Sequence, residues 1–316
     1  MVKTWKQKTL LAMLGLGLPL VSSLAKAAVY DRSGNKLPDA KRNSIEVNWE
    51  LLYAEQGKKY NGVGIIGYES DGFCTAFFLN TGGDDNSPAY AITNGHCYGG
   101  DQFPTAKEIL VNKPSNLVFK LNYFANKETL ARPVRVRQVV YATMKSTDIA
   151  ILELDSTFKQ LVKEGFTPLT IDDVPPAKGE PIEVIGIPMT QILPARRFLH
   201  RVVCQVGESV NLREDVYTWE KAIRHRCSAL GGMSGSPVIS LKTNRVVGIH
   251  NTSVTDRALT RTECAEDRPC EVGSEGKVAT FSQENYAQRV NNIPSCFNRM
   301  GIFNLNLPFC KLEKPN

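Results

Sequence analysis

The stretch GGMSGSPVIS, residues 231–240, places Ser234 in a glycine-rich turn directly before a short apolar run. A serine in this setting is either a nucleophile on a tight loop or an ordinary turn residue, and the local sequence leaves both interpretations open. A nucleophilic serine requires a general base, and the base requires a group that orients it. The choice therefore depends on whether the rest of the chain supplies a histidine, a carboxylate and a scaffold that unites them.

The first 27 residues have the composition of a secretory signal peptide. A cationic start, MVKTWKQK, precedes the apolar centre TLLAMLGLGLPLVSSLA and the small residues Ala25 and Ala27 of a cleavage site. A retained membrane anchor is the alternative, but the apolar centre is short and contains Gly and Pro. We therefore expect a secreted or periplasmic protein that makes no membrane contact once the signal is removed.

The net charge of +6 is concentrated in this first segment of the 316-residue chain. Four lysines and no acidic residue lie before residue 28, which leaves 34 basic and 32 acidic residues, a net charge of +2. A nearly neutral chain lacks the basic surface that nucleic-acid binding requires. We therefore expect protein or peptide partners and no nucleic acid.

Eight cysteines follow the predicted signal peptide, an even number that favours disulfides in an oxidising compartment. They are Cys74, Cys97, Cys204, Cys227, Cys264, Cys270, Cys296 and Cys310. A zinc site is the alternative, but no CxxC pair occurs, and the four histidines do not cluster with the cysteines at ligand spacing. We predict no metal and no other cofactor.

Short runs of apolar and β-branched residues alternate with turn residues through most of the chain. A first series comprises residues 62–68, 73–80, 89–93, 117–124, 134–142 and 149–154. A second series comprises residues 181–187, 201–206, 236–240, 245–250 and 277–282. Two series of short strands with few helices predict an all-β fold of two barrels. Only ENYAQRVNNI, residues 284–293, has helical spacing, which predicts a C-terminal helix.

These patterns divide the chain into five segments. The expected order is a signal peptide at 1–27, a propeptide or N-terminal strap at 28–60, a first β-barrel at 61–155, a second β-barrel at 156–290, and a disulfide-tied tail at 291–316.

His96 and Asp148 are the candidate base and orienting carboxylate. His96 lies in AITNGHCYGG, at the end of a predicted strand and beside Cys97, where a rigid strand and a disulfide could hold it. Asp148 lies in STDIAILEL, directly before another strand. Either could instead be an ordinary strand-end residue. His96 and Asp148 lie in the first strand series, and Ser234 lies in the second. If each series forms one barrel, a cleft between the two barrels would collect all three residues.

The segments TNGHC, TDIAIL and GMSGSP resemble the three sequence motifs of chymotrypsin-fold, trypsin-like serine proteases. The resemblance implies two perpendicular six-stranded antiparallel barrels. It also implies that His96 is the general base, Asp148 fixes its tautomer, and Ser234 attacks the scissile carbonyl. The backbone N–H groups of Gly232 and Ser234 would form the oxyanion hole. The α/β-hydrolase motif GxSxG does not fit, because Ser236 occupies the position of its final glycine.

Met233 replaces the aspartate that precedes the nucleophile in animal digestive enzymes and pairs there with a new N-terminus. This departure makes the chain similar to a bacterial branch that includes the glutamyl endopeptidases. That similarity implies that His250 and Ser253, in RVVGIHNTS, and Ser228, in HRCSALGG, line the primary pocket and bind an acidic side chain. Alternatively, His250 only satisfies a buried carbonyl and the preference is different.

A bridge between Cys74 and Cys97 would join neighbouring strands, and the other cysteines would pair as Cys204 with Cys227, Cys264 with Cys270, and Cys296 with Cys310. The sequence thus predicts an exported serine endopeptidase, expected to be a monomer, that hydrolyses peptide bonds through an acyl-enzyme and selects Glu before the cleaved bond. The alternative is a catalytically silent binding or adhesion protein on the same fold.

Overall fold

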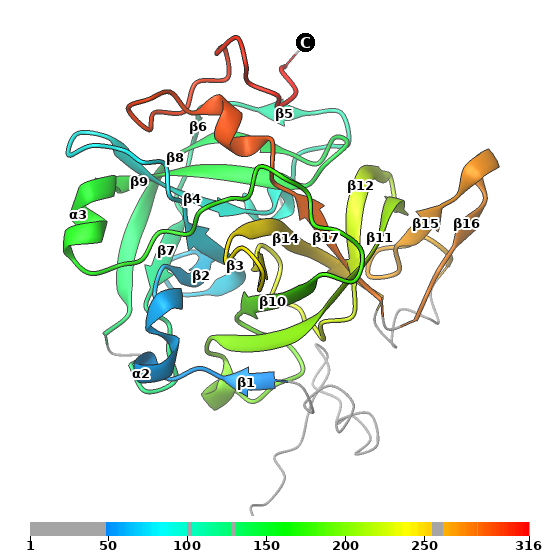
Figure 1. Cartoon of the computed structure of the whole chain (residues 1–316), viewed down its shortest axis with the longest axis horizontal. Helices are drawn as coiled ribbons and strands as arrows, with labels where there is room; N and C mark the ends of the chain where they lie inside the picture. The colour runs from blue at the N-terminus through cyan, green and yellow to red at the C-terminus, as the bar shows by residue number, and fades with distance from the viewer. Residues whose placement is uncertain (1–48, 100–102, 128–129, 255–261, 283, 316) are drawn as a thin grey trace, which may run out of the picture.

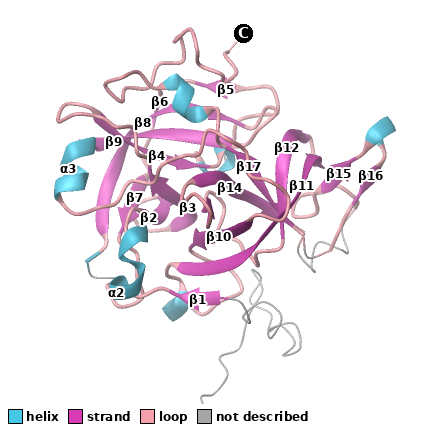
Figure 2. Ribbon diagram, in the orientation of Figure 1, coloured by secondary structure: helices cyan, strands magenta, loops and turns pink. Residues whose placement is uncertain are grey.

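The computed structural model describes residues 49–99, 103–127, 130–254, 262–282 and 284–315, which form two β-barrels packed against each other (Figure 1). The predicted signal peptide and the part of the strap before residue 49 lie outside the described residues. Strands dominate the fold, and the helices are few and short (Figure 2). The predicted all-β fold of two barrels is confirmed.

Six strands form the first barrel, and the pairing of β8 with both β7 and β9 closes it. The strands are β2 (Val63–Gly67), β3 (Gly72–Phe78), β4 (Pro88–Thr93), β7 (Val118–Leu121), β8 (Arg132–Thr143) and β9 (Ile149–Thr157). Two short strands, β5 (Ile109–Leu110) and β6 (Lys113–Pro114), pair with β8 outside this ring. All of these pairings are antiparallel.

Six further strands form the second barrel, which closes where β10 pairs with β11. The strands are β10 (Pro181–Gly186), β11 (His200–Glu214), β12 (Tyr217–His225), β13 (Pro237–Ser240), β14 (Val246–Ser253) and β17 (Asn285–Arg289). The hairpin of β15 (Cys270–Val272) and β16 (Val278–Ala279) extends from β11 and projects away from the barrel (Figure 1).

The helical elements connect strands and do not build a core of their own. They are α2 (Ala54–Gly57), α3 (Phe158–Lys163) and the 3-10 turns η1 (Lys58–Tyr60), η2 (Gly95–Cys97), η4 (Pro194–Arg196), η6 (Ser274–Gly276) and η7 (Ile293–Cys296). None of the helices in the described part of the chain is long and apolar enough to cross a bilayer.

Each barrel has its own apolar core, and a third apolar layer joins the two. Phe78 and Phe119 lie in the first core, and Val184 and Val238 lie in the second. The joining layer contains side chains from both barrels, Ile92 among them. Because strands at this junction are covered on both faces, β2 and β4 are continuous apolar runs without hydrophobic–polar alternation.

The C-terminal helix predicted over 284–293 is wrong. Residues Asn285–Arg289 form strand β17, which pairs with both β12 and β14. Tyr286 and Val290, four residues apart, are both fully buried, but so are Ala287 and Gln288 between them. Burial on both faces of a central strand removes the period-two alternation that would have revealed it.

The first described segment packs on the second barrel. Strand β1 (Trp49–Leu51) pairs with β11, and the indole N–H of Trp49 donates to the carbonyl of Ser228 at 3.2 Å. The fully buried carboxylate of Glu183 accepts a hydrogen bond from Tyr60 and a 2.6 Å ion pair from Arg201. These contacts tie residues 49–60 to the barrel, and the domain boundaries stay predictions.

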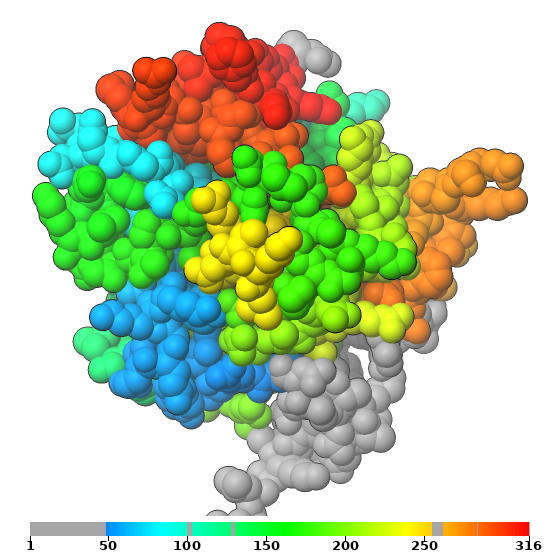
Figure 3. Space-filling view, viewed as in Figure 1, coloured from blue at the N-terminus to red at the C-terminus, as the bar shows by residue number. Residues whose placement is uncertain are grey.

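The C-terminal segment after β17 covers one end of the first barrel (Figure 3, red). Phe297 packs against both Tyr90 and Phe303, and the backbone N–H of Phe303 donates to the hydroxyl of Tyr90. The segment is held by a disulfide between Cys296 and Cys310. The other predicted pairs are also formed: Cys74–Cys97, Cys204–Cys227 and Cys264–Cys270.

Candidate active site

A cleft of about 620 Å³ is lined by residues of both barrels. His96 contributes from the turn after β4, and Gly232 and Ser234 contribute from the loop between β12 and β13. His250 and Ser253 contribute from the end of β14. The cleft therefore collects residues that are far apart in the sequence.

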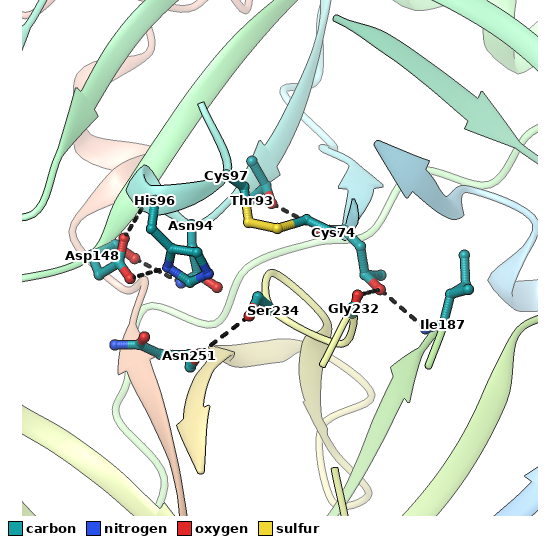
Figure 4. The surroundings of a disulfide bond; sticks show 11 residues. Cys74, Thr93, Asn94, His96, Cys97, Asp148, Ile187, Gly232, Ser234 and Asn251 are labelled. Carbon is teal, nitrogen blue, oxygen red and sulfur yellow. Dashed lines mark hydrogen bonds and ion pairs between the residues drawn. A yellow bond between two sulfur atoms is a disulfide. The ribbon is translucent and has the colours of Figure 1, made fainter. Parts of the chain in front are cut away.

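His96 and Asp148 form a close pair at one side of the cleft. The ring atom Nδ1 of His96 lies 2.6 Å from Oδ2 of Asp148, and the backbone N–H of His96 donates to Oδ1 at 3.0 Å (Figure 4). The side chain of Asp148 is fully buried, whereas that of His96 is 25% exposed toward the cleft. Asn94 donates to the backbone carbonyl of Asp148 at 2.8 Å, which links the two loops.

The charge around His96 favours its protonated ring. Burial alone would lower the pKa of His96, but the charge and hydrogen bond of Asp148 raise the pKa above its ordinary value. The carboxylates of Glu214 and Asp267 act in the same direction. An imidazole with a raised pKa is a stronger base and holds an accepted proton more readily.

The loop that carries Ser234 requires glycine at two positions. Gly232 has φ of +100°, and a Cβ there would lie 2.5 Å from Cγ of Met189. Gly235 has φ of +84°, and a Cβ there would lie 2.1 Å from the carbonyl oxygen of Thr75. Both the left-handed backbone and the close approach exclude larger residues. This explains the glycine spacing in GGMSGSP.

The backbone N–H groups of Gly232 and Ser234, on either side of Met233, have no internal partner among the residues that the structure describes. The neighbouring N–H groups of Met233 and Gly235 are bonded to Leu230 and His250, at 3.0 and 2.8 Å. The hydroxyl of Ser234 donates to the carbonyl of Asn251 at 3.4 Å, a long contact. The loop thus presents two donors and a weakly held hydroxyl beside His96.

The sequence profile of the trypsin-like peptidase domain matches residues 74–249, more than half of the chain. The chain belongs to the trypsin-like peptidase family. The predicted resemblance is therefore confirmed, and the protein is a serine endopeptidase by family. No functionally curated protein matches the sequence significantly.

Several solved proteases have a similar chain path and low sequence identity to this chain. The active form of the Rv3671c protease from M. tuberculosis is 14% identical with a TM-score of 0.48, over 82% of this chain and 85% of that chain. The MamO protease domain from Magnetospirillum magneticum is 16% identical with a TM-score of 0.47, over 76% and 98%. A Glu endopeptidase in complex with MPD is 16% identical with a TM-score of 0.43, over 77% and 90%. The family assignment rests on the sequence profile.

In this trypsin-like peptidase, His250 and Ser253 lie together at the cleft wall. The Ser253 hydroxyl is 3.4 Å from Nε2 of His250, whose side chain is almost fully buried. Burial lowers the pKa of His250 well below its ordinary value, and His225 and His96 add to this effect, so the ring is neutral. Ser228 is not among the described residues that line the cleft, and its role as a donor stays a prediction.

A second buried imidazole, that of His225, packs against the ring of His250. The two rings meet edge to face with centroids 5.5 Å apart. His225 is 1% exposed, and neither of its ring nitrogens has a partner within the described chain. Sequence reasoning missed this pair, because the two residues are 25 positions apart on strands β12 and β14 that do not adjoin.

The buried histidines make stability depend on pH. Burial lowers the pKa of His225 to about 3 and that of His200 to about 4, against about 6.5 in the unfolded chain. Their neutral forms therefore stabilise the fold fully above pH 6.5, and this contribution is lost as pH falls toward the lower values. We expect the free energy of unfolding to fall by on the order of 1 kcal/mol per pH unit for each histidine.

Urea denaturation at pH 7, 6 and 5 measures how the free energy of unfolding changes with pH. His225→Gln should reduce this slope by the amount that corresponds to about one proton taken up on unfolding. The comparison uses slopes, so a loss of absolute stability in the variant does not affect it. A slope in His225→Gln that equals the wild-type slope would contradict the prediction.

Glu214 is a further site residue that the sequence did not reveal. It ends β11, lines the cleft and is 8% exposed, and it accepts a 2.7 Å hydrogen bond from the backbone N–H of Asp267. Burial raises the pKa of Glu214 to about 7, although the Thr252 side chain and His96 oppose this rise. Nothing in the sequence around it, REDVYT, distinguishes it from a turn residue.

Within the described residues, two groups of sulfur and imidazole atoms lie at metal-ligand spacing. They are Cys74, His96 and Cys97, and Cys204, His225 and Cys227. In both groups the two sulfurs are joined in a disulfide, so neither group offers a thiolate to a metal ion.

Proposed function

We propose that the protein is an exported serine endopeptidase that cleaves peptide bonds through an acyl-enzyme on Ser234. The observation that carries the proposal is the 2.6 Å contact between His96 Nδ1 and Asp148 Oδ2 in the cleft that Ser234 also lines. A base oriented by a buried carboxylate beside a serine hydroxyl is the arrangement that nucleophilic catalysis requires.

His96 acts first as general base and then as general acid. Its Nδ1–H is held by Asp148, so Nε2 carries the lone pair that accepts the Ser234 proton. The Ser234 hydroxyl turns away from the Asn251 carbonyl as it attacks, and its weak 3.4 Å contact there opposes this rotation little. The imidazolium that forms is stabilised by the Asp148 carboxylate and later protonates the leaving amine.

The backbone N–H groups of Gly232 and Ser234 stabilise the oxyanion of the tetrahedral intermediate. Neither donor has a partner in the described part of the chain, so neither must break a hydrogen bond to bind substrate. Fixed donors of this kind act without reorganisation, and each one is typically worth about 3–4 kcal/mol in the transition state.

The primary pocket of the enzyme binds a Glu side chain before the cleaved bond. This specificity is supported by His250 and Ser253, which line the cleft with the Ser253 hydroxyl 3.4 Å from Nε2 of His250. With the ring proton on Nε2, both groups can donate to a bound carboxylate. Because the ring of His250 is neutral, it recognises a carboxylate by hydrogen bonds and not by net charge.

Export is supported by the N-terminal segment MVKTWKQK with its apolar continuation and by four disulfides, which persist in an oxidising compartment. The protein therefore acts outside the cytoplasm, either secreted or periplasmic.

A fluorophosphonate probe tests the proposed chemistry, because it reacts only with an activated serine. We expect covalent labelling of the purified protein, and mass spectrometry of its peptides should map the label to Ser234. A folded protein that remains unlabelled would instead support the catalytically silent binding protein.

The proposed specificity is tested with four peptides that differ only in the residue before the cleaved bond: Glu, Gln, Lys or Phe. We expect kcat/KM for Glu to exceed that for Gln by at least about 10-fold, because two donors face an acceptor-only carboxylate. Ser253→Ala should narrow this ratio. Faster cleavage after Lys or Phe would refute the acidic preference and leave the catalytic mechanism intact.

A further inference from the structure

Thr75 lies at the junction between the first barrel and the loop that carries Ser234. It is the residue after Cys74 on strand β3, and its side chain is fully buried. This nucleophile loop, which carries Ser234, belongs to the second barrel. Contacts between Thr75 and the nucleophile loop therefore let a strand of the first barrel position a loop of the second.

Three hydrogen bonds connect Thr75 to the second barrel. Its backbone N–H donates to the carbonyl of Ser234 at 2.8 Å, and its hydroxyl donates to the carbonyl of Gly232 at 2.9 Å. The same hydroxyl accepts the backbone N–H of Ile187 at 3.0 Å. The hydroxyl is therefore both donor and acceptor, and it is fully satisfied.

These contacts restrain the backbone on both sides of Met233. The hydroxyl of Thr75 holds the Gly232 carbonyl, which fixes the peptide between the two proposed oxyanion donors. On the other side of Gly232, the carbonyl of Gly231 accepts the backbone N–H groups of Met189 and Thr190, at 2.8 and 3.1 Å. Because hydrogen bonds hold the carbonyls of both Gly231 and Gly232, the orientation of the Gly232 N–H group is fixed.

We infer that the Thr75 hydroxyl is a positioning group that fixes the oxyanion loop in its productive conformation. The inference rests on the proposed function, since it assigns Thr75 a task within that site. Thr75 does not touch the substrate; it acts through the Gly232 carbonyl. Gly232 needs such a restraint, because glycine adopts positive and negative φ about equally and does not hold the φ of +100° by itself.

Thr75→Val is the decisive variant, because valine keeps the shape of threonine and removes the hydroxyl. It leaves the Gly232 carbonyl and the Ile187 N–H without this partner. We expect kcat per labelled active site to fall about 10- to 100-fold with KM unchanged. This decrease in kcat should not exceed the loss of about 10²- to 10³-fold that is expected when an oxyanion donor is removed outright. Thr75→Ser keeps the hydroxyl and should retain kcat within about 3-fold.

Thr143→Val is the matched control. The hydroxyl of Thr143 is equally buried, donates to the carbonyl of Glu108 at 2.8 Å and accepts the N–H of Lys145 at 3.0 Å. The Thr143→Val variant therefore loses the same kinds of hydrogen bond as Thr75→Val, at a place that does not contact the nucleophile loop. We expect a lower thermal midpoint in this variant without a change in kcat.

The experiment measures kcat and KM on a peptide amide, with active sites counted by fluorophosphonate labelling carried to completion. Partial unfolding lowers the number of labelled sites, whereas a displaced oxyanion loop lowers kcat per site. Thr75→Ala, assayed well below its thermal midpoint, replaces the valine variant if that protein does not fold.

A Thr75→Val or Thr75→Ala protein with kcat within about 3-fold of wild type would overturn the inference, as would a Thr75→Ser protein as slow as the valine variant. Both outcomes leave the proposed function intact, because the wild type is active in them. A wild type that neither labels nor cleaves would refute the proposed function, and the inference with it.

Discussion

Ser234→Ala is expected to lower kcat for peptide hydrolysis by about 10⁶-fold and to abolish fluorophosphonate labelling. The alanine side chain removes the attacking oxygen, and the residual rate comes from the oxyanion donors and substrate binding. The fold should be unaffected, because the lost hydroxyl makes one long contact of 3.4 Å to the Asn251 carbonyl. Turnover of a peptide amide and the thermal midpoint are the two measurements.

Ser236→Ala is the control for this variant. Ser236 lies in the same stretch, but its hydroxyl is buried and has no hydrogen-bond partner among the described residues. Removing an unsatisfied buried hydroxyl should leave both activity and stability near wild type. Activity that survives in Ser234→Ala and disappears in Ser236→Ala would identify Ser236 as the nucleophile and contradict the proposed mechanism.

The candidate site was predictable because each of its parts has a local sequence pattern. Ser234 lies in a loop in which φ of +100° at Gly232 and +84° at Gly235 requires glycine, so the backbone itself demands the pattern GMSG. His96 follows a strand and precedes Cys97, and the Cys74–Cys97 disulfide is formed. These constraints act over a few residues, and a sequence displays them directly.

Features that depend on tertiary contacts were not predictable. Strand β17 lies between β12 and β14, and its burial on both faces hides the alternation of a strand. Strand β12, YTWEKAIRH, was missed as well, because charged residues at both faces of its exposed half break the pattern. The side chains of Thr75 and Glu214 gain their importance from partners more than 50 residues away.

The structure also accounts for a nucleophile loop that has no carboxylate at position 233. Met233 is fully buried in the core of the second barrel, and Trp49 packs against the same core. The Trp49 indole N–H donates to the carbonyl of Ser228, five residues before Met233 in the same loop. Apolar burial and hydrogen bonds from other segments thus hold a loop that an ion pair holds in the digestive enzymes.

Asp148→Asn is expected to lower kcat by about 10⁴-fold while leaving the fold intact. Oδ1 of Asp148 accepts the backbone N–H of His96 at 3.0 Å, so the amide oxygen of asparagine will stay there. Its NH₂ group then faces Nδ1 of His96, which must become the acceptor. The proton of the neutral ring moves to Nε2, and Nε2 can no longer accept the Ser234 proton. Rotating the amide by 180° would place two donors against each other at the His96 N–H.

Asp155→Asn is the matched control, because the Asp155 side chain is 60% exposed and forms a surface ion pair with Arg137. It should retain wild-type kcat. Combining Asp148→Asn with Ser234→Ala should cost no more than Ser234→Ala alone, because the carboxylate acts only through the histidine and the serine. An Asp148→Asn enzyme within 10-fold of wild type would show that tautomer control is unimportant here. The buried carboxylate would then be a structural cap on the His96 turn and not a part of the catalytic relay.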